Sequence, residues 1–334
     1  MVIVFKKIAI FIVSILLSLS ANFGITPSFA FAPKDAENVQ LTFATVADTH
    51  LTGSRTRESL VKAAVMDAET SERNLDMFVL DGDNTNHGEL KQYESLTRAF
   101  DGCDPAENIY LVRGNHDTWT FGSDGEKDPS LADEYYFRFN EMITGKAREN
   151  VYYADVINGY HIIVLTSEGN SGDAATISEA QFQWYKAELE NAGADGKPIF
   201  VFCHYSFAGT HGLPYTFSHD KGDTDEVGGL GEYNDRILAE TSKYKNVFWI
   251  SGHIHGGFTE PILEKLTGYT AYENLNGINC INLPSLTKLQ INGHVTLGTG
   301  YVFEVYPDTV VARARNFVTG TWLPWHDITI ELEK

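Results

Sequence analysis

Short apolar runs alternate with amphipathic stretches between residues 41 and 256. The apolar runs are bounded by Gly, Asp or Asn, which is typical of strands. They predict six strands: Leu41–Ala47, Met77–Leu80, Ile109–Val112, Tyr160–Thr166, Ile199–Cys203 and Val247–Ile250. The amphipathic stretches predict five helices: Arg57–Ser71, Glu89–Phe100, Ala132–Ile143, Ser178–Asn191 and Tyr233–Tyr244. Strands that alternate with helices indicate βαβ units, in which helices cover both faces of a sheet.

The pattern changes from about Ile278 onward, where four strand-like segments follow one another without a clear helix. We interpret this tail as a second sheet packed on the first. The expected fold is therefore α/β (α+β), a double β-sheet sandwich flanked by helices. A separate C-terminal domain is the alternative, but no Pro- or Ser-rich linker precedes the tail. We expect one domain over residues 41–334, preceded by a short leader at 33–40.

The N-terminus has the pattern of a secretory signal peptide. Lys6 and Lys7 precede an apolar run from Ile8 to Leu19, which is shorter than the roughly 20 residues of a membrane span. Small residues then occur at cleavage spacing, in Ser28-Phe29-Ala30 and again in Ala30-Phe31-Ala32. We place the signal peptide at residues 1–32 and expect a secreted or cell-surface protein without a stable membrane span. An uncleaved anchor is the alternative.

Composition narrows the classes of partner. The net charge is −20 over 334 residues, and nucleic-acid phosphates require a Lys and Arg excess, so no dedicated nucleic-acid binding is expected. The three cysteines, Cys103, Cys203 and Cys280, allow at most one disulfide within the chain. The fold must therefore depend on its core, which 43% hydrophobic content can supply.

Polar residues of the metal-binding types follow the C-terminal ends of the predicted strands. They are Asp48, His50, Asp83, Asn115, His116, Asp117, His204, His253 and His255. The crevice beyond the carboxyl ends of strands is where open α/β sheets bind ligands. A single Asp or His at a strand end is usually a turn or capping residue. Five such coincidences in one chain are far less expected, so we interpret the set as a site.

The order of these motifs resembles that of the calcineurin-like metallophosphoesterases. The family pattern DxH, GD, GNH[DE], H and GHxH is similar to "DTH" at 48–50, "GD" at 82–83, "GNHD" at 114–117, His204 and "GHIH" at 252–255. The resemblance covers residues 41 to 256. It implies a double β-sandwich flanked by helices and a small phosphoester as substrate.

The resemblance also implies two divalent metal ions. One would be held by Asp48, His50 and His255, the other by Asn115, His204 and His253, with Asp83 bridging both. These ligands offer oxygen or nitrogen and no sulfur, which suits Mn, Fe, Zn, Co or Ni. Two such ions can generate a bridging hydroxide near neutral pH and clamp the oxygens of a phosphoryl displacement.

Two further residues are expected to act in catalysis by the same resemblance. His116 would face the leaving group, where an imidazolium could stabilise charge or donate a proton. Asp117 would orient His116 and keep it charged. Arg113 is as often an ordinary salt-bridge partner as a phosphate clamp, and we do not include it in the site.

Departures from subfamily patterns narrow the expected substrate. Purple acid phosphatases carry a metal-binding tyrosine three residues after the bridging aspartate, where this chain has Asn86. Secreted 5′-nucleotidases of the superfamily usually have Glu at the place of Asp117 and a large C-terminal domain. The chain looks most similar to single-domain members such as class III cyclic-nucleotide phosphodiesterases. We therefore expect a phosphodiesterase. A phosphomonoesterase and a non-catalytic metal-binding surface protein are the alternatives.

One long loop, 205–229, lies beside the expected site in the sequence and has no clear secondary-structure pattern. Its His211, His219, Tyr215 and Phe217 are candidate substrate contacts, and Trp119 is a candidate pocket wall.

Overall fold

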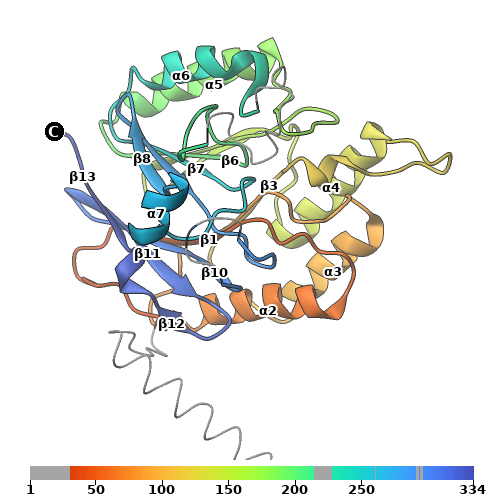
Figure 1. The fold of residues 1–334 in the computed structure, drawn as a ribbon, viewed down its shortest axis with the longest axis horizontal. Coiled ribbons are helices and arrows are strands. Elements are labelled where there is room, and N and C mark those ends of the chain that lie inside the picture. The colour runs from red at the N-terminus through yellow and green to blue at the C-terminus, as the bar shows by residue number, and fades with distance from the viewer. Residues whose placement is uncertain (1–30, 214–227, 260, 291–292, 294–295) are drawn as a thin grey trace, which may run out of the picture.

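Two β-sheets lie face to face at the centre of the molecule, and helices cover their outer faces (Figure 1). The computed structural model describes residues 31–334 except 214–227, 260, 291–292 and 294–295. The two-sheet sandwich predicted from the sequence is therefore confirmed.

The first sheet has seven strands in the order β12-β11-β10-β1-β2-β3, with β13 paired to β11. Their bounds are Leu41–Val46 (β1), Met77–Asp81 (β2), Ile109–Val112 (β3), Thr299–Val305 (β10), Thr309–Asn316 (β11), Thr321–Trp322 (β12) and Ile328–Glu331 (β13). The second sheet has six strands in the order β4-β5-β6-β7-β9-β8. Their bounds are Tyr153–Ile157 (β4), Tyr160–Leu165 (β5), Ile199–Cys203 (β6), Val247–Ser251 (β7), Tyr272–Leu275 (β8) and Ile278–Asn282 (β9).

Aromatic side chains fill the space between the sheets. Phe43 of β1 stacks on Phe303 of β10 with ring centroids 4.6 Å apart, and it meets Phe200 of β6 edge to face at 5.2 Å. All three side chains are fully buried. Burial of each contributes about 1.5–3 kcal/mol. This core joins the two sheets and so fixes the edges of both relative to each other.

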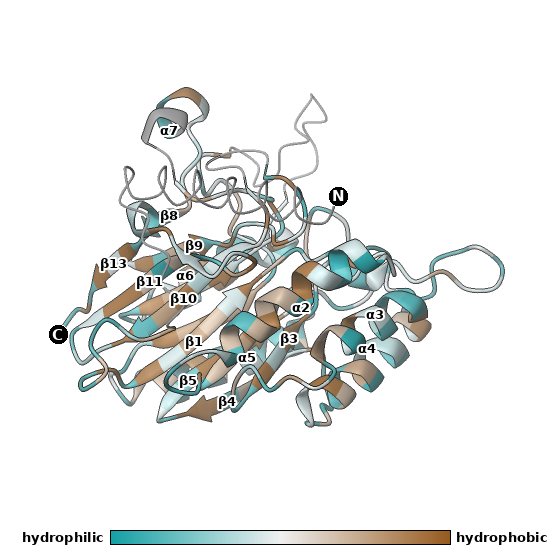
Figure 2. Ribbon diagram, turned by 90° about the horizontal axis from the view of Figure 1, so that it is seen from below, coloured by the Kyte–Doolittle hydropathy of each residue, from teal (hydrophilic) through white to brown (hydrophobic). Residues whose placement is uncertain are grey.

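Four helices cover the outer faces of the sheets (Figure 1). Helices α2 (Arg55–Glu69) and α3 (Leu90–Phe100) cover the seven-stranded sheet; α5 (Glu179–Gly193) and α6 (Asn234–Thr241) cover the six-stranded sheet. Their buried residues recur at helical spacing, as Val61 and Val65 do in α2. Figure 2 shows these helices with hydrophobic and hydrophilic faces. The remaining α-helices of the described residues are α4 (Pro129–Thr144), beside α3 and β3, and the short α7 (Pro261–Thr267).

Parallel strands in each sheet bring their carboxyl ends to a common edge. In one sheet β1, β2 and β3 are parallel neighbours, and in the other β5, β6, β7 and β9 are. A parallel bridge between Ala47 and Ser285 connects the two sheets at this edge. The backbone N–H of Leu286 also donates to the carbonyl of Ala47 at 3.0 Å. Loops from both sheets therefore converge at one place.

The predicted arrangement of the tail is wrong in one respect. We expected its strands to form a second sheet by themselves. Instead β9 joins β5, β6 and β7, whereas β10, β11 and β13 extend the sheet of β1, β2 and β3. Each sheet thus combines parallel strands with strands from the tail. Strand β10 joins the first sheet because it pairs antiparallel with β1 from Leu41 to Thr45.

Two hairpins were missed because their turn signals were overlooked. Asn158-Gly159 connects β4 to β5, and Asn276-Gly277 connects β8 to β9. Both residues of each pair have positive φ, at 52° and 77° in the first and 52° and 89° in the second. An Asn-Gly pair with this backbone is typical of a two-residue hairpin turn. Strands β4 and β8 themselves are only partly buried, so their hydrophobic pattern is weak.

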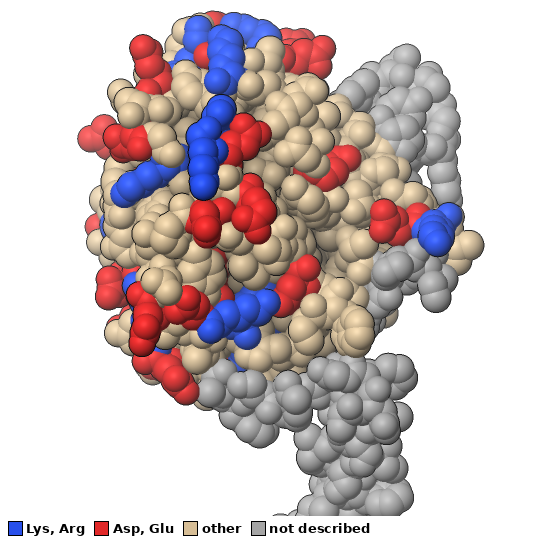
Figure 3. Space-filling model, turned by 90° about the vertical axis from the view of Figure 1, so that its left-hand side faces the viewer, with Lys and Arg blue, Asp and Glu red and all other residues tan. Residues whose placement is uncertain are grey.

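The described residues include the three cysteines and a surface that carries both acidic and basic side chains. On the face in Figure 3, Asp and Glu side chains lie among the Lys and Arg side chains. Cys103, Cys203 and Cys280 are all free thiols. Cys203 belongs to the core between β6 and α5, as expected from its place before His204 in an extended segment. Among the described residues, no helix has the length and apolar content needed to cross a membrane.

Candidate metal centre

The site lies at the common edge of the two sheets, and each sheet supplies part of it. Asp48 and His50 follow β1, Asp83 follows β2 and Asn115 follows β3, all in the seven-stranded sheet. From the six-stranded sheet, His204 follows β6, and His253 and His255 follow β7. The site therefore exists only when the sandwich has formed.

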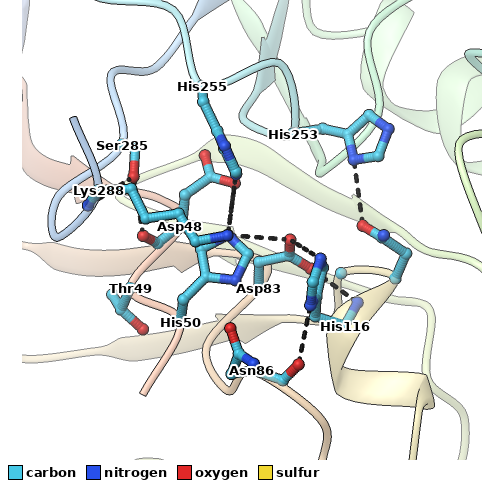
Figure 4. A network of polar contacts seen from close by, with 12 residues as sticks. Asp48, Thr49, His50, Asp83, Asn86, His116, His253, His255, Ser285 and Lys288 are labelled. Carbon is cyan, nitrogen blue, oxygen red and sulfur yellow. Dashed lines mark hydrogen bonds and ion pairs between the residues drawn. The ribbon is translucent and has the colours of Figure 1, made fainter. Parts of the chain in front are cut away.

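One group of potential ligands lies on one side of Asp83 (Figure 4). It consists of Asp48, His50, Asp83 and His255. The Nε2 atoms of His50 and His255 are 2.9 Å apart, and Nε2 of His255 is 3.1 Å from Oδ1 of Asp48. Nε2 of His50 is 3.4 Å from Oδ2 of Asp83. Two nitrogens and two carboxylates thus converge on one point, which is the arrangement of a metal site.

A second group lies on the other side of Asp83. It consists of Asp83, His204 and His253. Nε2 of His204 is 3.4 Å from Oδ1 of Asp83, and Nδ1 of His253 is 3.1 Å from Oδ1 of Asn115. Asp83 thus presents one carboxylate oxygen to each group. The structure brings all seven predicted ligands together in the predicted partition; their binding of metal stays a prediction.

The backbone at the ligands is strained. Five of the seven have positive φ: Asp48 (54°), His50 (40°), Asp83 (49°), His253 (69°) and His255 (46°). This region is uncommon for residues other than glycine and costs on the order of 1–3 kcal/mol per residue. Such strain clusters at functional sites, where the surrounding structure holds it. The sequence contains no signal of it.

Burial and charge set the protonation of the ligands. Burial lowers the pKa of His50 and of His253 to about 3, so both rings are neutral and keep a nitrogen lone pair. Burial alone would lower the pKa of His204, but the charges of Asp83 and Asp48 raise it to about 10. Burial raises the pKa of Asp83 less than its histidine neighbours lower it, so Asp83 is ionised. The carboxylates of Asp83 and Asp48 therefore favour positive charge at His204.

The donor atoms of the site fit divalent metal ions. Oδ2 of Asp48 and Nε2 of His204 are fully buried and have no hydrogen-bond partner among the described residues. Buried polar atoms normally have partners, because leaving one unpaired costs about 1–3 kcal/mol. Carboxylate, amide and imidazole donors without a thiolate suit Mn, Fe, Zn, Co or Ni. The residues present therefore match the dinuclear centre.

Two glycines make room for these ligands. A Cβ on Gly114 would lie 2.2 Å from Oδ1 of Asp83, and a Cβ on Gly82 would lie 2.3 Å from Nδ1 of His204. Gly82 also has φ +83°. The glycines of the "GD" and "GNHD" motifs are thus required by close approach to the ligands.

Gly114→Ala is expected to displace Asp83 and so remove metal from both groups. Elemental analysis of the purified variant after Mn²⁺ loading measures this, with retained content expected below about a tenth of that of the native protein. Gly172→Ala is the control, because a Cβ at Gly172 has no atom within 4 Å. Full metal content in Gly114→Ala would contradict the shared role of Asp83.

His116 lies beside the ligands but has a different orienting partner from the one predicted. Its Nδ1 donates to the backbone carbonyl of Asn86 at 2.8 Å. A carbonyl only accepts, so Nδ1 carries the hydrogen. Nε2 then faces the site, 3.9 Å from Oδ2 of Asp83. Burial lowers the pKa of His116, so the structure does not favour the imidazolium that we expected at rest.

Asp117 has no hydrogen bond to His116 among the described contacts, although its charge raises the pKa of His116 in the predicted direction. Asp117 is fully buried, and its carboxylate accepts hydrogen bonds from the backbone N–H groups of Asn84, Thr85 and Gly114 at 2.8–3.1 Å. The Thr85 hydroxyl donates as well, at 2.7 Å. These bonds saturate the carboxylate before it can reach His116. Asp117 instead ties the loop after β2 to the loop after β3.

The other residues considered in the sequence have different places in the structure. Arg113 is buried and pairs with Asp133 at 2.6 Å, so it is a salt-bridge partner. Trp119 does lie at the site, with its ring centroid 3.9 Å from that of His116. His211 is buried, and its Nδ1 donates to the carbonyl of Thr270 at 2.9 Å, which holds its own loop. Tyr215, Phe217 and His219 lie outside the described residues.

Sequence reasoning also missed Lys288. It follows β9 and lies in Figure 4 on the Asp48 side of the network. Its backbone N–H donates to Oγ of Ser285 at 3.2 Å, and that hydroxyl donates to the carbonyl of Asp48 at 3.1 Å. Because Lys288 is more than thirty residues beyond the last motif, no spacing pattern points to it.

Comparison with known proteins decides the family. The family model described as calcineurin-like phosphoesterase matches residues 41–257. The chain belongs to the calcineurin-like phosphoesterase family. It is therefore a metal-dependent phosphoester hydrolase of a family that uses a dinuclear metal centre. The matched region begins at β1 and ends just after His255, so it contains all seven predicted ligands.

Solved structures show the same fold. A dimetal phosphatase from Danio rerio has a TM-score of 0.57 and 17% identity, covering 89% of this chain and 100% of that one. A purple acid phosphatase from yellow lupin (Lupinus luteus) seeds has a TM-score of 0.55 and 13% identity, covering 87% of this chain and 53% of that one. No curated protein sequence matches the chain.

Proposed function

We propose that this protein is an exported phosphodiesterase whose two ligand groups, which have Asp83 in common, would hold two divalent ions. One observation carries the proposal: the two oxygens of Asp83 face two separate ligand groups, at 3.4 Å from His50 and 3.4 Å from His204. Two divalent ions in such a pair of sites supply a hydroxide nucleophile near neutral pH and stabilise charge on the phosphoryl oxygens. Mn, Fe, Zn, Co and Ni all suit the donor set.

His116 donates a proton to the leaving group after its Nε2, which carries no hydrogen in the neutral ring, has taken one up from water. Its Nδ1 is committed to the carbonyl of Asn86, so only Nε2 can exchange a proton with substrate. The backbone N–H of His116 donates to Oδ1 of Asp83 at 2.9 Å, which fixes the ring relative to the bridging carboxylate. Ring contact with Trp119 limits its rotation further. His116 is thus held where it can protonate a departing oxygen, which contributes about 10²–10⁴-fold to rate.

Asp117 acts as a positioning residue. Its bonds to Asn84, Thr85 and Gly114 hold the loops that carry Asp83 and Asn115 at a fixed separation. Burial raises the pKa of its carboxyl, and the N–H donors around it oppose that shift. The spacing of the bridging carboxylate and the Asn115 amide therefore depends on this one side chain.

The diester preference rests on features of the chain outside the metal ligands. Asn86 stands where a metal-binding tyrosine would indicate a purple acid phosphatase, and its side chain contacts His87 instead. Phosphomonoester hydrolysis is the second candidate, because the two similar structures are both named phosphatases. Both reactions use the same centre, and they differ in the charge and size of the group bound at phosphorus.

Hydrolysis of bis(p-nitrophenyl) phosphate and of p-nitrophenyl phosphate tests the choice. The Mn²⁺-loaded protein is expected to have the higher kcat/KM on the diester and to lose activity on both after chelation. A higher kcat/KM on the monoester would mean that the protein is a phosphomonoesterase and not a phosphodiesterase. Metal loading without turnover of either ester would contradict both. A panel of cyclic nucleotides, nucleotides, glycerophosphodiesters and sugar phosphates then identifies the substrate.

The signal-peptide pattern of residues 1–32 supports export of the protein. Residues 1–30 of this segment lie outside the described residues. Recovery of the protein from the medium or cell surface of an expressing cell is the expected result, and retention in the cytosol would contradict it. The protein's net charge of −20 favours solubility outside the cell and disfavours binding to anionic surfaces.

A further inference from the structure

Lys288 is held against the loop that carries two ligands. The hydroxyl of Thr287 donates to the carbonyl of Thr49 at 2.6 Å, and the hydroxyl of Ser285 donates to the carbonyl of Asp48 at 3.1 Å. Both side chains are buried. Lys288 is half-buried, whereas the next residue, Leu289, is 67% exposed. The backbone of Lys288 is therefore fixed at the metal centre, and its side chain is not released to solvent.

The charge of Lys288 acts on the site itself. It lowers the pKa of His50 and of His116. Burial lowers the pKa of Lys288 itself, and the charges of Asp48 and Asp83 only partly oppose this effect. Among the described residues, its ammonium has no hydrogen bond or ion pair. Partial burial of an ammonium without a direct partner is unfavourable. Divalent ions at the two ligand groups would repel it further, so an anion is needed to balance it.

We propose that Lys288 binds the anionic phosphoryl group of the substrate at the metal centre. The inference rests on the proposed function and adds a residue to it. An ammonium beside the metals contributes a charge-assisted hydrogen bond to a phosphoryl oxygen. It also explains why a half-buried lysine stands at this place in a chain with a net charge of −20.

Calorimetric titration of the Mn²⁺-loaded protein with inorganic phosphate tests this role without turnover. Lys288→Met is expected to weaken phosphate binding about tenfold or more, and Lys288→Arg to retain most of the affinity. Lys245→Met is the control, because Lys245 precedes β7 at the opposite edge of the sheet and its side chain is 64% exposed. Its phosphate affinity should equal that of the native protein.

Phosphate affinity within about twofold of native in Lys288→Met would overturn the proposal. Elemental analysis distinguishes phosphate binding by Lys288 from a structural role in holding the metal site. Removing a positive charge beside two divalent ions should not weaken their binding, so loss of metal from Lys288→Met would also overturn it. Because no step of the titration requires hydrolysis, failure of the proposed enzymatic activity leaves this result interpretable.

A second observation concerns Phe31, whose side chain is buried against the folded domain. Its side chain is 2% exposed, with its ring centroid 5.4 Å from that of Trp322. The guanidinium of Arg315 lies 4.6 Å from the ring centroid of Phe31. The carbonyl of Phe31 accepts hydrogen bonds from the N–H of Glu72 at 3.0 Å and the hydroxyl of Ser71 at 2.9 Å. Cleavage after Ala32 would remove all of these contacts.

We infer that signal peptidase hydrolyses the bond between Ala30 and Phe31, so that Phe31 is the first residue of the mature chain. The inference rests on the proposed export. Ser28 and Ala30 supply the small residues that the peptidase requires. Water adds across the peptide bond, leaving a carboxylate on Ala30 and an amino group on Phe31. This boundary differs from the predicted one at residue 32.

N-terminal sequencing and intact mass of the secreted full-chain product test the boundary. We expect a chain that begins at Phe31. A chain that begins at Pro33, or one that keeps residues 1–30, would overturn the inference. Phe31→Ala should lower the Tm by about 5 °C or more, whereas Phe121→Ala, at a 45% exposed position, should leave it nearly unchanged. Neither measurement depends on enzymatic activity.

Discussion

Replacing His116 by alanine is expected to leave both metal ions bound and to reduce kcat by about 10²–10⁴-fold. The reason is that Nε2 of His116 faces the site while its Nδ1 is held by the carbonyl of Asn86. The ring does not belong to either ligand group. Metal content by elemental analysis and kcat on phosphodiesters measure the two parts of the result.

Comparing esters with different leaving groups distinguishes proton donation by His116 from a general electrostatic effect. p-Nitrophenolate departs without a proton, whereas an alkoxide needs one, so the loss in His116→Ala should be larger for alkyl esters than for p-nitrophenyl esters. His161→Ala is the matched control, since His161 pairs with Asp195 at the start of β5, at the opposite edge of the sheet. A His116→Ala variant with near-native kcat on alkyl diesters would contradict the assigned role.

His253→Ala and His255→Ala are each expected to lose one metal ion, and not the same one. Nε2 of His255 lies 2.9 Å from Nε2 of His50, whereas Nδ1 of His253 lies 3.1 Å from Oδ1 of Asn115. Losing one of the few ligands at a site should weaken metal binding at least about 10–100-fold there. Each variant should therefore retain one equivalent of Mn²⁺.

The metal content of double variants shows whether the two histidines hold the same ion, without a structure of the loaded protein. His50→Ala combined with His255→Ala removes two ligands of one group and should retain one equivalent. His253→Ala combined with His255→Ala removes one ligand from each group and should retain none. Retention of one equivalent by the second pair would mean that both histidines hold the same ion, as a simple chelate.

The positions of the predicted ligands could be inferred from the sequence because these residues follow strand ends. In an α/β fold the residues just after parallel strands lie at one edge of the sheet. The location of Asp83 or His204 at that edge can therefore be predicted from the sequence. The partition of His253 and His255 between two ions came from the family resemblance. Spacing alone would equally permit both to hold one ion.

The parts that could not be predicted depend on contacts between distant segments. Asp117 is next to His116 in the chain, yet its carboxylate points to the backbone of Asn84 and Thr85. Lys288 reaches the site only because Ser285 pairs with the loop after β1. The allocation of the tail strands likewise follows from pairing of β10 with β1. The two Asn-Gly hairpins, in contrast, were readable from local turn chemistry.

Anomalous diffraction from Mn²⁺-soaked crystals tests the shared role of Asp83 most directly. Two peaks are expected. One should lie among Asp48, His50 and His255, and the other among Asn115, His204 and His253, with one oxygen of Asp83 bound to each. A single peak, or two peaks of which Asp83 contacts only one, would contradict the dinuclear centre on which the proposed hydrolysis depends.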